Sequence, residues 1–212
     1  MEDDREIRDA HLEMIEKHDG MSTRNETERL AVQLLPVSKS ARLPLFEIAQ
    51  GTLRQLSPEQ YNRCRERVLQ LIKADEKFNL FEFIMQCVLL NHLDRHFAVT
   101  KRPRVQYYSM KGVTGDIAVL LSSLAHVGHS DAEQARKTYE AAIAPLQLET
   151  HSVRFLDRPL CTLPRLKAAL ESLATCSMPI RKRLLGAATL CVAADGTVTI
   201  GEAELLRAAA SA

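Results

Sequence analysis

The sequence predicts an all-α protein, a compact bundle of about nine or ten helices. Apolar residues recur at helical spacing through most of the 212 residues, and no clean period-2 alternation extends beyond a few positions. Gly and Pro are scarce, with 8 of each, whereas Leu, Ala, Glu and Arg, which favour helices, are abundant. These observations argue against a β-sandwich or barrel.

The helices are expected in a definite order along the chain. A first, highly charged helix ends near Gly20, and Pro36 marks a joint, so residues 1–35 form an N-terminal helical extension to a domain over 36–212. Ser57 and Ser177 each stand just before a helix that has proline in its first turn. Apolar stripes predict helices at 45–56, 61–72, 84–89, 117–127, 135–143, 166–173 and 178–194.

An internal repeat lies at an offset of 120 residues, with copies around 57–95 and 177–212. Each copy contains Ala-Asp at the end of a helix, followed by an N-cap residue, Asn79 or Thr199, and by a Glu three residues later. Glu82 and Glu202 therefore close capping boxes, and Gly196 suits the left-handed position after a helix. The repeat predicts two pseudo-symmetric helical hairpins.

Composition excludes several classes of function. Lys and Arg total 28 and Asp and Glu total 27, so the net charge of +1 disfavours nucleic acid as a partner. The chain has five cysteines without a CxxC pair, which indicates reduced thiols. Its N-terminus is acidic, and no apolar run reaches the roughly 20 residues that span a bilayer. We expect a soluble, cytoplasmic protein.

A resemblance to a known family rests on the order and spacing of five segments: 43–47, 53–61, 71–75, 80–82 and 89–93. With the Ala-Asp turns, they resemble the C-terminal cytosolic region of bacterial HtpX-like, CaaX-prenyl-protease-type zinc metallopeptidases, which has the TerB-like hairpin fold. In that family a membrane-embedded peptidase domain, which holds the zinc, precedes this region. The resemblance covers about residues 30–210 and implies a TerB-like domain next to an inner-membrane protease.

The chain departs from that family in its catalytic signature. No HExxH motif, which supplies two zinc-binding His and a catalytic Glu, occurs in it. The sequence therefore predicts an excised, non-catalytic accessory domain with no cofactor of its own, whose zinc belongs to the parent peptidase. Its partner is expected to be that peptidase domain or another protein, and its membrane proximity to come through the parent chain.

Two metal-site candidates support an alternative function, a metal-responsive TerB-like binding module. His92 and His96 share a helix face, with His126 and His129 as possible further ligands. The same positions suit a helix C-terminus, whose negative end favours His. The acidic candidates are Asp75, Glu82, Asp195 and Glu202, and the capping boxes explain these residues without a metal.

Two other groups have simple interpretations. Cys64 and Cys87 lie on apolar stripes, which predicts buried thiols rather than nucleophiles. The run Arg181, Lys182, Arg183 is typical of a solvated helix start, and contact with anionic lipid is the alternative.

Overall fold

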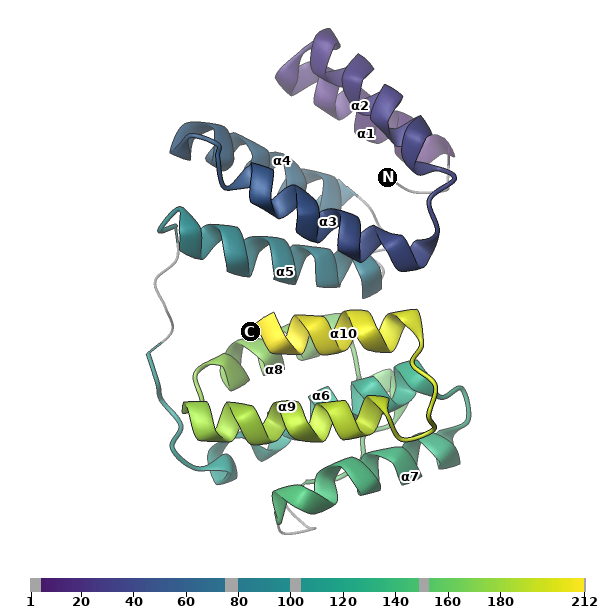
Figure 1. The fold of residues 1–212 in the computed structure, drawn as a ribbon, viewed down its shortest axis with the longest axis vertical. Coiled ribbons are helices and arrows are strands. Elements are labelled where there is room, and N and C mark those ends of the chain that lie inside the picture. The colour runs from purple at the N-terminus through teal and green to yellow at the C-terminus, as the bar shows by residue number, and fades with distance from the viewer. Residues whose placement is uncertain (1–4, 75–79, 100–103, 149–152, 212) are drawn as a thin grey trace. The chain divides into compact units, whose positions relative to one another are not determined.

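The computed structural model describes residues 5–74, 80–99, 104–148 and 153–211. These ranges form ten α-helices and three short 3₁₀ helices, and they hold no β-strand (Figure 1). One isolated bridge pairs Tyr107 with Cys176. The predicted all-α class is therefore confirmed. No helix in these ranges has both the length and the apolar character needed to cross a bilayer.

The chain divides into two compact units, residues 1–82 and 83–212. The division falls in the first turn of α5 (Leu80–His96). The boundary predicted after residue 35 lies between α2 (Met21–Leu34) and α3 (Lys39–Leu53) of the first unit, and it stays a prediction.

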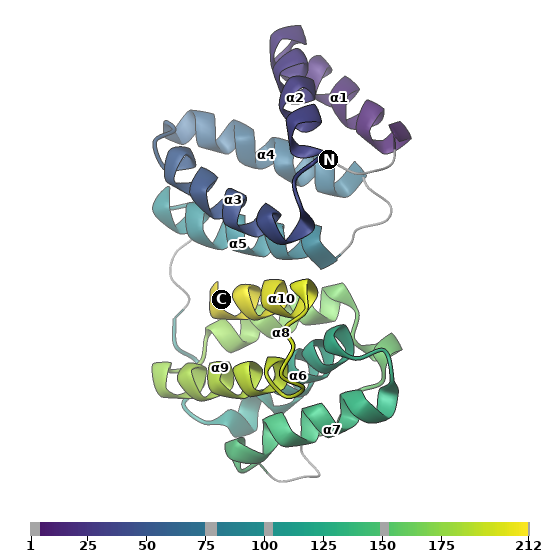
Figure 2. The same cartoon turned by 45° about the vertical axis from the view of Figure 1, so that its right-hand side comes forward.

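The first unit begins with a helical hairpin. The charged helix α1 (Arg5–Asp19) lies beside α2, as Figures 1 and 2 both show. Gly20 joins them with a φ of 85°, a left-handed conformation in which glycine has no steric penalty. The predicted end of the first helix is therefore confirmed. Leu12 and Ile15 form the buried stripe of α1, whereas no described side chain of α2 is buried.

A bidentate ion pair fixes α1 to α4 (Pro58–Ala74). Arg67 Nε donates to Asp19 Oδ2 at 2.6 Å, and Arg67 Nη2 donates to Asp19 Oδ1 at 3.3 Å. The two side chains are 17% and 26% exposed, so water screens the pair less than it screens a fully exposed one. This pair links segments that are 48 residues apart.

Arg67→Gln is expected to weaken the attachment of α1 by about 1 kcal/mol, because both hydrogen bonds to the carboxylate are lost. Amide hydrogen exchange in α1 measures this change. Arg29→Gln is the matched control, since the Arg29–Glu26 pair lies within one helix and both side chains are more than half exposed. Equal exchange in the two variants would show that the Asp19 pair does not hold α1.

The second unit is built around α6 (Thr114–Gly128). Every side chain from residue 117 to residue 126 is buried. Four helices contact α6 and cover it on several sides: α7 (Ala132–Ile143), α8 (Leu163–Ala174), α9 (Met178–Val192) and α10 (Ile200–Ser211). A helix that is apolar around its circumference is expected in such a central position.

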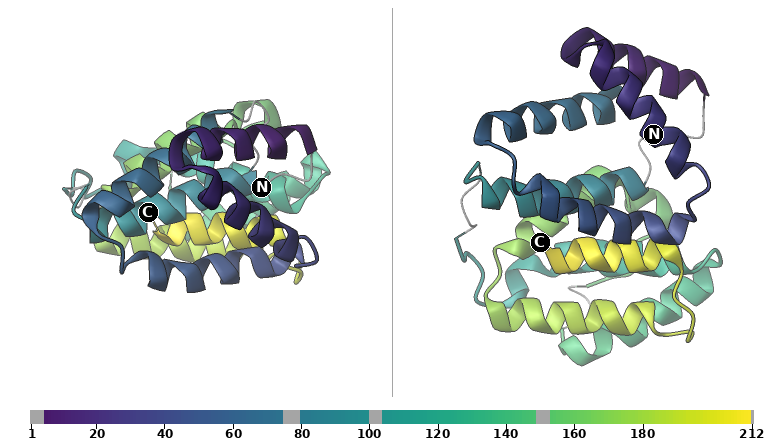
Figure 3. Two further views of the ribbon diagram at one scale, coloured as in Figure 1. Left: turned by 90° about the horizontal axis from the view of Figure 1, so that it is seen from above. Right: turned by 45° about the horizontal axis from the view of Figure 1, so that its top comes forward.

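The helix starts agree with the 120-residue repeat. α4 begins at Pro58 and α9 at Met178, whereas α5 begins at Leu80 and α10 at Ile200. In the second copy, α9 and α10 lie side by side as a hairpin (Figure 3). Gly196 in its turn has a φ of 75°, as predicted for the position after a helix.

The capping box predicted for α10 is confirmed. Thr199 N donates to Glu202 Oε2 at 2.9 Å, and Glu202 N donates to Thr199 Oγ1 at 3.2 Å. Thr199 Oγ1 also donates to Glu202 Oε2 at 2.7 Å. For the first copy, Asn79 lies outside the described residues.

Candidate functional site

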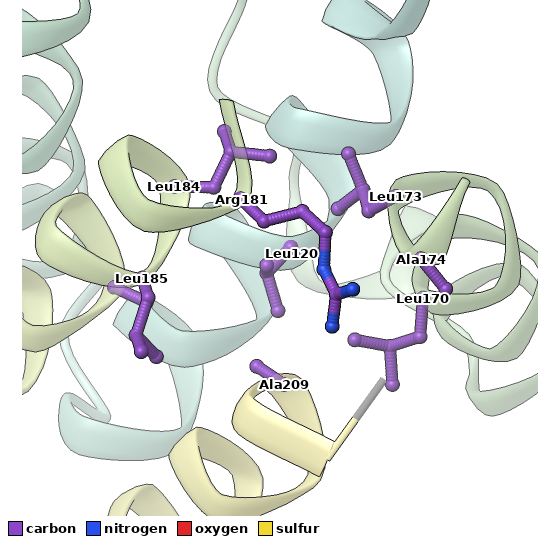
Figure 4. Close-up of a pocket in the computed structure, with 9 residues that line it drawn as sticks. Leu120, Leu170, Leu173, Ala174, Arg181, Leu184, Leu185 and Ala209 are labelled. Atoms are coloured by element: carbon purple, nitrogen blue, oxygen red, sulfur yellow. The ribbon is translucent and has the colours of Figure 1, made fainter. Parts of the chain in front are cut away.

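The second unit carries a small apolar pocket, in which about 30 Å³ is accessible to a water molecule. α6, α8, α9 and α10 contribute its walls (Figure 4). The lining consists of apolar side chains and one arginine: Leu120, Leu170, Leu173, Ala174, Arg181, Leu184, Leu185, Ala188 and Ala209. A mostly apolar lining with a single polar group is typical of a binding site, and the small volume limits an occupant to the end of one side chain.

Helical spacing explains how α9 presents the arginine to this pocket. Arg181, Leu184, Leu185 and Ala188 occupy positions i, i+3, i+4 and i+7, which lie on one face of a helix. The cation therefore stands within the apolar stripe that faces α6, α8 and α10. Its side chain is half-buried.

The Arg181 guanidinium makes no hydrogen bond or ion pair with any residue that the structure describes, although the Arg181 backbone N–H donates to Ser177 O at 3.0 Å. Figure 4 shows its guanidinium reaching from α9 toward Leu170 and Ala174 of α8. Among the described residues, none that lines the pocket carries a carboxylate. A guanidinium that loses part of its water shell without gaining a partner costs free energy, and an anion that enters the pocket would recover that cost.

The neighbouring arginine is in a different situation. Arg183 Nη2 donates to the carbonyl oxygens of Leu146 at 2.8 Å and Pro145 at 3.4 Å. It therefore helps to fix the turn after α7. The prediction of a solvated helix start holds for the exposed Lys182, but it fails for Arg181, which faces an apolar pocket.

Both acidic candidates near α10 are engaged in local hydrogen bonds. Asp195 Oδ1 accepts from Thr197 N at 2.9 Å, and this bond is the main cause that lowers the pKa of Asp195. Glu202 is 2% exposed and belongs to the capping box. Of the first-copy candidates, Glu82 lies in the first turn of α5, and Asp75 lies outside the described residues.

The histidine candidates lie on two helices. His92 is half-buried and His96 is exposed near the end of α5, where His96 meets Phe97 edge to face. At the end of α6, His126 Nε2 lies 2.8 Å from Leu156 O, and His129 Nε2 lies 2.8 Å from Thr138 Oγ1. Within the described ranges, no three His, Cys, Asp or Glu side chains form a group that could hold a metal ion.

All five cysteines carry free thiols. Cys64 and Cys87 are half-buried, so the prediction of buried thiols is wrong for both. The helical period shows on which face a residue lies, but it does not show how fully neighbouring helices cover that face. Burial raises the pKa of Cys64, and it raises the pKa of Cys87 to about 11 and that of Cys191 to about 12. These shifts disfavour the nucleophilic thiolate.

We therefore expect the native chain to be alkylated slowly. At pH 8 a thiol with a pKa of about 11 has roughly a hundredfold less thiolate than one with the ordinary value of 9.0. Iodoacetamide labelling followed by mass spectrometry should show Cys87 and Cys191 reacting much more slowly than free cysteine, and all five thiols reacting in urea. A native thiol that reacts as fast as free cysteine would indicate an activated nucleophile.

The site that sequence reasoning missed is the pocket around Arg181. Its sequence signal is a cation placed in register with the apolar stripe 184, 185 and 188. The resemblance to the C-terminal region of HtpX-like peptidases depends on other segments, and nothing in the pocket bears on it. That family stays a prediction, because no family model, curated protein or solved structure matches the chain.

Proposed function

We propose that this chain is a non-catalytic accessory domain that binds a protein partner. The observation that carries the proposal is the apolar pocket of the second unit, with a half-buried guanidinium that has no partner among the described residues. Such a pocket suits the anchor of a protein interface, in which a few buried contacts supply most of the affinity.

The chemistry of the polar groups supports binding rather than catalysis. The raised thiol pKa values disfavour a cysteine nucleophile, and the Glu202 carboxylate is engaged in capping α10. The helix starts at 58, 80, 178 and 200 support the repeat, and the packing of α9 against α10 supports a TerB-like hairpin in its second copy. We therefore propose that the domain belongs to a zinc metallopeptidase of the HtpX-like type, whose zinc and active site lie in the parent peptidase domain.

Site-specific photocrosslinking in cells tests the proposal. Leu185 lines the pocket and is 40% exposed, so p-benzoylphenylalanine at this position lies close to a bound partner. Leu190 is the matched control, since it is 49% exposed on the same helix and does not line the pocket. We expect position 185 to crosslink one defined protein that position 190 does not, and this protein, once purified, to bind the purified chain.

Two outcomes would contradict the proposal. The first is that positions 185 and 190 give the same crosslinks, which would mean that the pocket faces no partner. The second is that the purified chain itself hydrolyses peptides in the presence of zinc, which would make it an enzyme.

A further inference from the structure

The pocket has a chemistry that selects its ligand. One wall is apolar, with Leu170 and Leu173 from α8 and Leu184 from α9, and all three side chains are buried. Arg181 adds a polar requirement, because its planar fork of N–H donors matches the two oxygens of a carboxylate. A ligand that satisfies both must carry an apolar group and an anionic group close together.

The charge of the site favours a carboxylate over a phosphate. A carboxylate carries one negative charge, which a single guanidinium neutralises. A phosphate monoester carries about 1.5 to 2 negative charges at neutral pH, so it would bring uncompensated charge against the apolar wall. The described part of the chain contributes no second cation to the lining that could balance it.

The size and the rim of the pocket favour a protein segment over a small molecule. Only about 30 Å³ of the pocket is accessible to a water molecule, far below the roughly 300–1,000 Å³ of ligand pockets, so it can hold the end of one side chain but not a small molecule. At the rim, Leu185 lines the pocket and is 40% exposed, so it offers apolar contact to the residues that flank an inserted side chain.

We propose that the pocket binds a segment of a partner protein in which an apolar side chain stands next to an Asp or a Glu. The end of the apolar side chain packs against the leucines of α8 and α9 that line the pocket, and the carboxylate accepts hydrogen bonds from the Arg181 guanidinium. The inference rests on the proposed function and specifies the partner's chemistry. Removing the carboxylate or the apolar side chain should each weaken binding.

Short blocked peptides test this recognition on the full chain labelled with ¹⁵N. The probes are acetyl-Gly-Leu-Glu-Gly-amide, its Leu-Gln counterpart and its Ser-Glu counterpart. The Leu-Glu peptide is expected to shift the amide signals of 181–188 and Ala209 in a saturable manner. Each counterpart is expected to bind at least tenfold more weakly, because one of the two required groups is missing.

Two variants separate the role of Arg181 from general charge. Arg181→Gln should bind the Leu-Glu and Leu-Gln peptides equally, with its amide signals away from the pocket unchanged. Lys182→Gln removes the same charge from the adjacent, exposed position and should keep the tenfold preference for Glu. Loss of the preference in both variants, or in neither, would overturn the assignment to Arg181.

The remaining outcomes separate a failure of this inference from a failure of the proposed function. Equal binding of the Glu and Gln peptides to the unmodified chain, or no shift at the pocket, would overturn this inference, while a specific crosslink at position 185 would leave the proposed function standing. Octanoate is the last probe. If octanoate saturates the pocket more tightly than the Leu-Glu peptide does, a small carboxylic acid is the ligand and the peptide proposal is wrong.

Discussion

Leu124→Ala is expected to lower the free energy of unfolding of the second unit by about 2–5 kcal/mol. Leu124 is fully buried in the middle of α6, the helix that contacts α7, α8, α9 and α10. Replacing its isobutyl side chain by a methyl group costs the transfer free energy of three buried carbon atoms. It also leaves a cavity that helices on several sides cannot close without separating from one another.

Hydrogen exchange of the α6 amides under native conditions measures this change. The slowest amides report the free energy of opening the whole unit, so their protection should fall about 30-fold or more. Leu190→Ala is the control, because Leu190 is 49% exposed on α9 and should alter stability by less than about 0.5 kcal/mol. Similar effects of the two substitutions would show that α6 is not the core of the unit.

Gly128→Ala is expected to destabilise the second unit by about 1–2 kcal/mol, although alanine normally favours a helix. Gly128 ends α6, and a methyl group added there would overlap the carboxylate of Glu202. Glu202 would have to leave the capping box, in which it accepts hydrogen bonds from the backbone and the hydroxyl of Thr199. The glycine is needed for this close approach.

A double-mutant cycle with Glu202→Ala tests the mechanism. Glu202→Ala removes the carboxylate, so Gly128→Ala in that background should be neutral or slightly stabilising. The coupling free energy between the two positions is then about 1–3 kcal/mol, measured by urea unfolding followed by circular dichroism. Additive effects would mean that the methyl group is accommodated without displacing Glu202.

The helices and one of the caps were predictable because the forces that set them are local. Thr199, Glu202 and Gly196 lie within seven residues of one another, and their hydrogen bonds depend on backbone geometry within two helical turns. The starts of α4 and α9 likewise follow from Ser57 and Ser177 with the prolines that come after them. Sequence patterns carry such short-range information well.

The pocket was not predictable in the same way, because its walls come from positions as far apart as 120 and 209. Arg181 and Arg183 look equivalent in the sequence, two residues apart in one basic run. In the structure, Arg183 bonds to the carbonyl oxygens of Leu146 and Pro145, whereas Arg181 faces leucines. Packing between distant helices decides which arginine is satisfied, and the sequence records only that Arg181 shares the register of 184, 185 and 188.

The central place of α6 also has a consequence during synthesis. The helices that cover it follow it in the chain, and α10, which contributes Ala209 and the Glu202 contact at Gly128, is made last. At 5–20 residues per second, the ribosome needs roughly 4–17 s to extend the chain from the end of α6 to the end of α10. During that interval, the most apolar helix of the unit lacks part of its cover, so nascent chains stalled before residue 200 should be preferred clients of chaperones.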